Sequence, residues 1–358
     1  MRLFSTVFTS FSPIRLTFPV ALLSIATVLS GCSDDGGGSG SSSITNVEGW
    51  VGAQSFNSAQ VVVNQVAESG QVGTSTDGIY FGVRESTDDE GGFNAAIAND
   101  EIIMFIARGQ VANVDKDLNN LATSRQCQVF SGCTVSGASY SFGSFYPATS
   151  GFEWRSVIYT ASEGATNNVN PITTLAAAFA YEYDVSAFAN SAFNNQTFTA
   201  YDVVLANSQV SKLFGLGDII GVTPANLTKL NRLNTNTTAV QQQIKYGALL
   251  AAIQAKELQE NQLQENQPGN SDFFKNVVDQ FVENEGQFYF KQDTPATNDL
   301  TLSGLYQAAL DNLAPIADGI TNSQAKAAAQ AVIADFNQLI ATANDDSKLN
   351  VKTQVAPD

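Results

Sequence analysis

The residue types that most often perform catalysis are few in this chain, and their spacing gives them little support. The 358 residues include no histidine, which excludes Ser-His-Asp and Cys-His catalysis and removes the commonest zinc ligand. Ser323 and Lys326 have an S-x-x-K spacing, but no companion motif accompanies them, and Ser323 fits the start of a helix. Asp88, Asp89 and Glu90 are adjacent in a predicted turn, a poor geometry for two facing carboxylates. We therefore predict no enzymatic activity and no cofactor.

Oxygen-bearing side chains alternate at Asp115, Asp117 and Asn119, like the front of an EF-hand calcium loop. The twelfth position of such a loop falls on Gln126, where a bidentate glutamate is expected, and Lys116 adds an unfavourable charge. A solvated turn is the simpler interpretation. We therefore predict no metal site and keep the three residues as a calcium candidate.

The first 31 residues have the pattern of an export signal. Arg2 gives a positive start, no acidic residue precedes Asp34, and the stretch from Leu16 to Leu29 is almost wholly apolar. That stretch is shorter than the roughly 18 apolar residues that a membrane-spanning helix needs.

The end of this signal, Leu29-Ser30-Gly31-Cys32, resembles the lipobox of bacterial lipoproteins. The resemblance implies cleavage before Cys32, a diacylglycerol on its thiol, and anchoring to a membrane by the acyl chains. Ser33 in place of aspartate implies delivery to the outer membrane, with either face open. An ordinary secretory signal with a chance cysteine is the alternative.

Lipidation of Cys32, as the resemblance implies, leaves Cys127 and Cys133 as an even pair. Exported compartments are oxidising, so we expect a disulfide between these two residues. It would close a short loop and act as a local staple. A redox-active pair is the alternative, although the spacing is unlike Cys-x-x-Cys.

The chain is strongly acidic, with 17 basic and 34 acidic residues and a formal net charge of −17. Such a surface repels phosphate backbones, which argues against nucleic acid as a partner.

Residues 46–168 have the pattern of an antiparallel β-sandwich, because short apolar runs alternate with glycine, serine, threonine and asparagine. Strands are predicted at 47–51, 60–66, 79–83, 102–107 and 154–159. The segment Thr87-Asp88-Asp89-Glu90-Gly91-Gly92-Phe93 resembles the T-D-x-x-G-x-F turn of carboxypeptidase-regulatory-like, prealbumin-type domains. That resemblance implies a polar turn with glycine at positive φ, an aromatic entering the core, and a mostly structural or carbohydrate-adjacent module.

An aromatic-rich insertion follows within this region. Its aromatic residues are Tyr140, Phe142, Phe145, Tyr146, Phe152 and Trp154. Tyr146 and Trp154 are the glycan-contact candidates, whereas packing at the edge of the sandwich is the usual role of such rings.

Residues 169–344 have helical periodicity, with Asn170 as an N-cap and Pro171 in the first turn. Further helices are predicted at 200–214, 238–262, 273–285, 300–313 (ending before Pro315) and 321–343. Gly247 is expected to let a neighbouring helix approach closely. The segment Val169–Ala176 resembles the V-x-P-L-T-x-L-A segment of exported bacterial lipoproteins, in which a β-rich module passes into a helical one. A helical bundle would bury every apolar face.

The sequence thus predicts an α+β protein, an N-terminal antiparallel β-sandwich followed by a C-terminal α-helical bundle. Its parts are a signal peptide (1–31), a flexible tether (32–45), the sandwich (46–168), the helical domain (169–344) and a disordered tail (345–358). The predicted function is that of a lipid-anchored cell-envelope lipoprotein with a non-catalytic structural or binding role, whose partner is an envelope protein or a glycan. A carbohydrate-binding surface lipoprotein and an unrecognised envelope hydrolase are the alternatives.

Overall fold

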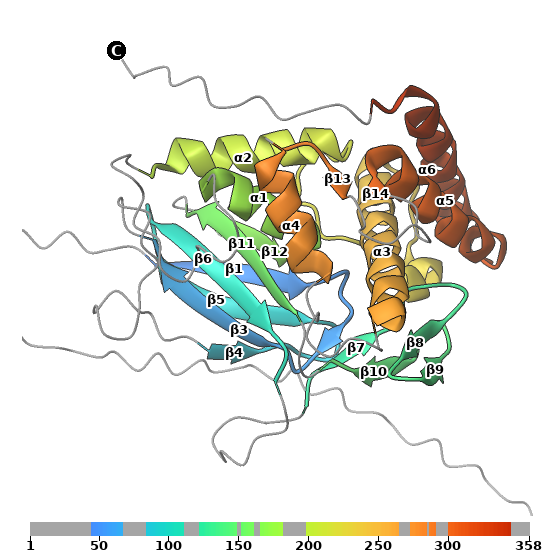
Figure 1. Cartoon of the computed structure of the whole chain (residues 1–358), viewed down its shortest axis with the longest axis horizontal. Coiled ribbons are helices and arrows are strands. Elements are labelled where there is room, and N and C mark those ends of the chain that lie inside the picture. Colours follow the sequence, from blue (N-terminus) through green and yellow to red (C-terminus); the bar gives the residue numbers. More distant parts are fainter. Residues whose placement is uncertain are drawn as a thin grey trace, which may run out of the picture. The chain divides into compact units, whose positions relative to one another are not determined.

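The structure is a computed structural model with mixed α+β content, in which most strands precede residue 170 and most helices follow it (Figure 1). It describes residues 44–66, 84–110, 122–148, 152–160, 165–181, 198–264, 273–284, 286–290 and 300–344. All of these belong to one compact unit, Ser42–Asp358. The predicted signal peptide with Cys32, the predicted tail and the strand expected at 79–83 lie outside the described residues. Within the described part, no helix has both the length and the apolar character needed to cross a membrane.

Two sheets account for most of the strand residues. In the first, β1 (Ile44–Val51) lies between β12 (Ala165–Val169), to which it is parallel, and β5 (Gly92–Ala98), to which it is antiparallel. The second has the antiparallel order β11-β6-β3-β4 and consists of Glu153–Tyr159, Ile102–Arg108, Gln60–Gln65 and Arg84–Ser86. The strands predicted at 47–51, 60–66, 102–107 and 154–159 are therefore confirmed, with small differences at their ends.

Strand β6 is apolar at six consecutive positions because both of its faces are covered. Ile103, Phe105 and Ala107 point to one side, where they share a hydrophobic cluster with Val47 of β1 and Phe93 of β5. Its other side belongs to a second cluster. That cluster contains Ile102, Met104 and Ile106 together with Ile172 and Leu175 of the first helix. The second sheet thus shares one hydrophobic cluster with strands of the first sheet and another with helices.

The helices follow the predicted periodicity. They are α1 (Pro171–Tyr181), α2 (Ala200–Leu213), the 3₁₀ helix η2 (Leu227–Arg232), α3 (Thr238–Gln264), α4 (Phe273–Glu283), α5 (Leu302–Asp318) and α6 (Ser323–Thr342), with a short β13–β14 pair (Tyr289–Phe290 and Leu300–Thr301) before α5. Asn170 caps α1 as predicted, since its side-chain oxygen accepts hydrogen bonds from the amides of Ile172 and Thr173. Helices α1 and α2 contact β11, and α5 lies beside α6 (Figure 1).

Two details of the helical region differ from the sequence-based expectation. Helix α5 does not end before Pro315 but continues to Asp318. Pro315 has no amide N–H to donate to the carbonyl of Asp311, and burial of Ile316 and Ala317 in the extra turn offsets this loss. The other detail is Gly247, whose close neighbour is a loop and not a helix: a Cβ at this position would lie 2.1 Å from the carbonyl oxygen of Ala225.

Candidate functional site

A groove of about 440 Å³ opens between helix α3 and a small hairpin, β8 (Cys133–Val135) and β9 (Ala138–Tyr140). The hairpin contributes Thr134, Ser139 and Tyr140 to the lining, the turn before it contributes Ser131, and α3 contributes Ala255, Leu258 and Gln259. A two-residue turn connects the hairpin strands, and both of its residues, Ser136 (φ 49°) and Gly137 (φ 77°), have the positive φ that such turns require.

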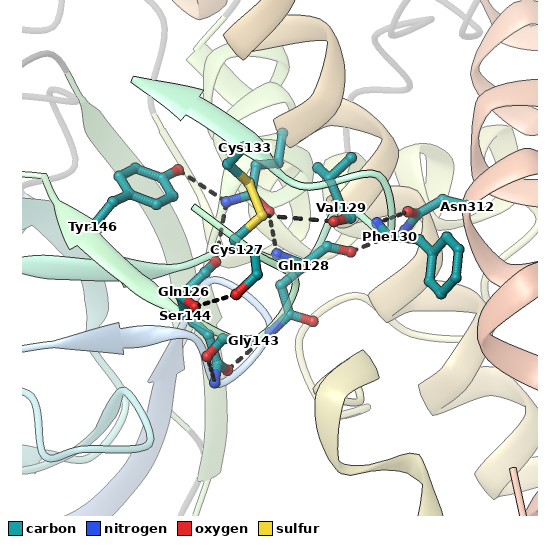
Figure 2. Close-up of a disulfide and its surroundings, with 12 residues drawn as sticks. Gln126, Cys127, Gln128, Val129, Phe130, Cys133, Gly143, Ser144, Tyr146 and Asn312 are labelled. Carbon is teal, nitrogen blue, oxygen red and sulfur yellow. Dashed lines mark hydrogen bonds between the residues drawn. A yellow bond between two sulfur atoms is a disulfide. The ribbon is translucent and has the colours of Figure 1, made fainter. Parts of the chain in front are cut away.

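The Cys127–Cys133 pair lies at disulfide distance beside the groove, with the two Cα atoms 5.9 Å apart and both side chains buried (Figure 2). This geometry is what the sequence predicted for the pair. The backbone of Cys127 is also fixed, because its amide donates to the carbonyl of Ser144 and its carbonyl accepts from the amide of Gly143, at 2.9 and 2.8 Å. The disulfide therefore joins the base of the hairpin to a backbone segment that is already held in place.

Buried amide side chains hold this segment against two helices. Gln254 of α3 accepts a hydrogen bond from the amide of Gln128 (3.0 Å) and donates to the hydroxyl of Tyr146 (2.9 Å). Asn312 of α5 accepts from the amide of Phe130 (2.6 Å) and donates to the carbonyl of Gln128 (3.0 Å), as Figure 2 shows. Because unpaired buried polar groups are costly, these bonds fix how the segment docks on the helices.

A buried ion pair lies under the same region. Arg125 of β7 (Ser124–Gln126) contacts Glu257 of α3 at 2.7 Å, and its guanidinium is 5.3 Å from the ring centre of Phe56 and 5.0 Å from that of Trp154. Burial lowers the pKa of Arg125, but Tyr146 and Glu257 raise it by more, so the guanidinium stays charged. Burial also raises the pKa of Tyr146, which keeps its phenol protonated.

The two predicted glycan contacts lie in the interior. Trp154 is 1% exposed and packs against Phe56 and Phe152, and Tyr146 is 5% exposed beneath Gln254. A glycan could reach neither ring unless the surrounding layers separated. Both side chains pack into hydrophobic clusters: Trp154 of β11 joins the cluster that the two sheets share, and Tyr146 of β10 (Phe145–Pro147) packs with the disulfide and Leu258.

The acidic turn has a structural role. The carboxylate of Asp88 accepts hydrogen bonds from the amides of Glu90 (2.8 Å) and Gly92 (2.7 Å), Gly91 has a φ of 79°, and Phe93 is buried. Glu90 pairs with Lys229 of η2 at 2.6 Å, and that hydrogen bond and the lysine charge lower the pKa of Glu90. The turn thus has the local geometry that its glycine and aromatic predicted.

A second carboxylate with a lowered pKa is Glu153. Burial raises the pKa of Glu153, but the charges of Arg155 and Arg108 outweigh burial and bring it below its usual value.

The remaining candidates are not among the described residues that line the groove. The calcium candidate Asp115, Asp117 and Asn119 lies outside the described residues. Where the chain is described, no three histidine, cysteine, aspartate or glutamate side chains are grouped to hold a metal ion. Ser323 begins α6, which Asn322 caps.

The groove was not predicted from the sequence, although two of its lining residues were singled out: Cys133 in the expected disulfide and Tyr140 in the aromatic-rich insertion. A signal for the hairpin was present, since Ser136-Gly137 separates two short β-prone runs. The position of Leu258 opposite that hairpin had no comparable signal, because it depends on a contact between distant parts of the chain. Comparisons of the chain with protein-family models, curated proteins and solved structures find no match.

Proposed function

We propose that this chain is an exported, lipid-anchored envelope protein with a non-catalytic binding role, and that the groove between the β8–β9 hairpin and α3 is its binding site. The cysteines provide the main support. The chain has three; Cys127 and Cys133 are a pair at disulfide distance. The remaining one, Cys32, occupies the lipobox position. Disulfides persist in oxidising compartments outside the cytoplasm, where a lipoprotein resides.

The groove suits binding better than catalysis. Its volume of about 440 Å³ is within the range of small-molecule sites. Among the residues that the structure describes, its lining contains hydroxyls, an amide and apolar side chains but no carboxylate, lysine or arginine that could act as an acid–base pair. The acidic turn that might have served a hydrolase is engaged in its own hydrogen bonds.

The proposal includes two finer points. The two sheets would form a β-sandwich, which is supported by the cluster that their facing residues share. Delivery to the outer membrane is supported by Ser33 after the lipobox cysteine.

Lipidation is tested by mass spectrometry of the protein from a membrane fraction, together with detergent phase partitioning. We expect the mature chain to begin at Cys32, to carry the mass of a diacylglycerol, and to enter the detergent phase. Cys32→Ala should remain unprocessed and lose the lipid, whereas the neighbouring control Ser33→Ala should behave like the wild type. An unmodified Cys32 in the wild type would contradict the proposal.

A further inference from the structure

We propose that the groove between the β8–β9 hairpin and α3 binds a neutral saccharide of one or two rings. The inference rests on the binding role proposed for this groove but does not depend on lipidation. It differs from a site at Tyr146 and Trp154, because both of those rings are buried.

The charge of the lining selects a neutral ligand. The whole chain carries a formal charge of −17, yet none of the described residues that line this groove is charged. A site for a cation would use carboxylates, and a site for an anion would use arginine or lysine. A charged ligand would lose hydration on entering the groove, and no described side chain of the lining would offset that loss with an ion pair.

The polar side chains of the lining suit a ligand with many hydroxyls. Three exposed residues at the groove are Ser139 on the hairpin, Ser131 in the turn before it and Gln259 on α3. No hydrogen bond with another described residue engages their side chains. A serine hydroxyl both donates and accepts, and a glutamine amide does the same through separate atoms. A saccharide hydroxyl also donates and accepts, and is therefore complementary to all three.

The apolar part of the lining suits the C–H faces of a sugar ring. Tyr140 is half-buried and rests on Tyr146, with the ring centres 5.8 Å apart. Tyr146 is in turn held by Gln254. The Tyr140 ring is therefore supported from behind and offers a flat, amphipathic surface. Leu258 and Ala255 continue this apolar surface on the α3 side of the groove.

The test uses the full chain in detergent, a glycan array and calorimetric titration with neutral disaccharides such as cellobiose and maltose, with oligogalacturonate as the charged comparison. We expect a neutral saccharide to bind and oligogalacturonate not to bind. Tyr140→Ala should weaken binding about tenfold, the equivalent of roughly 1.4 kcal/mol. Phe145→Ala is the matched control, because Phe145 is an exposed aromatic outside the groove lining and its loss should leave affinity unchanged.

A second variant distinguishes a direct loss of binding from a folding defect in Tyr140→Ala. Ser139 is exposed, so Ser139→Arg should fill the groove, abolish binding and leave the thermal unfolding midpoint unchanged. Binding of a peptide or a charged glycan in place of neutral saccharides would overturn the inference and leave the binding role standing. Equal losses in Tyr140→Ala and Phe145→Ala would also overturn it. If neutral saccharides, charged glycans and peptides all fail to bind, both the inference and the proposed binding role fall.

Discussion

Replacing Glu257 by glutamine tests whether the buried ion pair holds the disulfide segment on α3. The side chains of Arg125 and Glu257 are 7% and 14% exposed, and the nitrogen–oxygen distance is 2.7 Å. Removing one partner of a buried pair leaves the other charge uncompensated, which costs about 3–5 kcal/mol. Glutamine retains a hydrogen-bond acceptor, so we expect Glu257→Gln to lower the free energy of unfolding by about 3 kcal/mol.

Urea denaturation of the oxidised protein measures this loss. Asp279→Asn is the control, because Asp279 pairs with Lys275 on the more exposed surface of α4, and such pairs contribute about 0.3–0.5 kcal/mol. Adding Arg125→Met to Glu257→Gln removes the unpaired charge and keeps a side chain that packs on Phe56. The double variant should therefore be more stable than Glu257→Gln alone.

Two results would refute this reasoning. One is a loss in Glu257→Gln as small as the loss in Asp279→Asn, which would mean that water screens the pair. The other is a double variant whose loss equals the sum of the losses in Glu257→Gln and in Arg125→Met measured separately, since independent sites add and coupled sites do not.

Three further predictions concern other parts of the fold. Gly247→Ala should lower stability by about 1–3 kcal/mol in thermal unfolding, because its new methyl group meets a backbone carbonyl, whereas Gly217→Ala, with open space around it, should be neutral. The pKa of Glu153 is lowered in the folded protein. The carboxylate therefore stabilises the fold above the ordinary pKa of 4.5, and this stabilisation is lost as the pH falls through the pKa of the folded state. Glu153→Gln should accordingly lose less stability than the wild type in unfolding titrations below pH 4.5. An equal slope of stability against pH in the variant and the wild type would contradict this. Reduction of Cys127–Cys133, which are six residues apart, should cost about 2 kcal/mol in a denaturant titration with and without reductant, and no change in midpoint would contradict a stapling role.

The periodic elements could be predicted from the sequence because their signals are local. Helix α3 was expected at 238–262 and spans Thr238–Gln264, and the N-cap of α1 was expected at Asn170. The positive φ of Gly91 could likewise be predicted, since it follows from residues within one turn. Each of these features depends on side chains within a few positions along the chain.

The site could not be predicted in the same way because burial is decided by distant partners. Tyr146 and Trp154 are in an aromatic-rich segment, and the sequence alone does not distinguish an exposed platform from a core. Burial of Trp154 depends on Phe56 and Arg125, which belong to other strands. The helix end predicted before Pro315 was wrong for a similar reason, because burial of the next turn offsets the local preference for ending the helix.

The hydrogen bonds of Asn312 impose an order on the assembly of this protein. Phe130 and Gln128 find their partner 182 and 184 residues further along the chain. Long-range closures of this kind form late, whereas the loop between Cys127 and Cys133 needs only local encounters. In an oxidising compartment the covalent link can therefore form before α5 packs against the hairpin segment. A chain truncated before residue 312 would carry a closed disulfide loop that could dock on α3 through Gln254 but would lack its second support on α5.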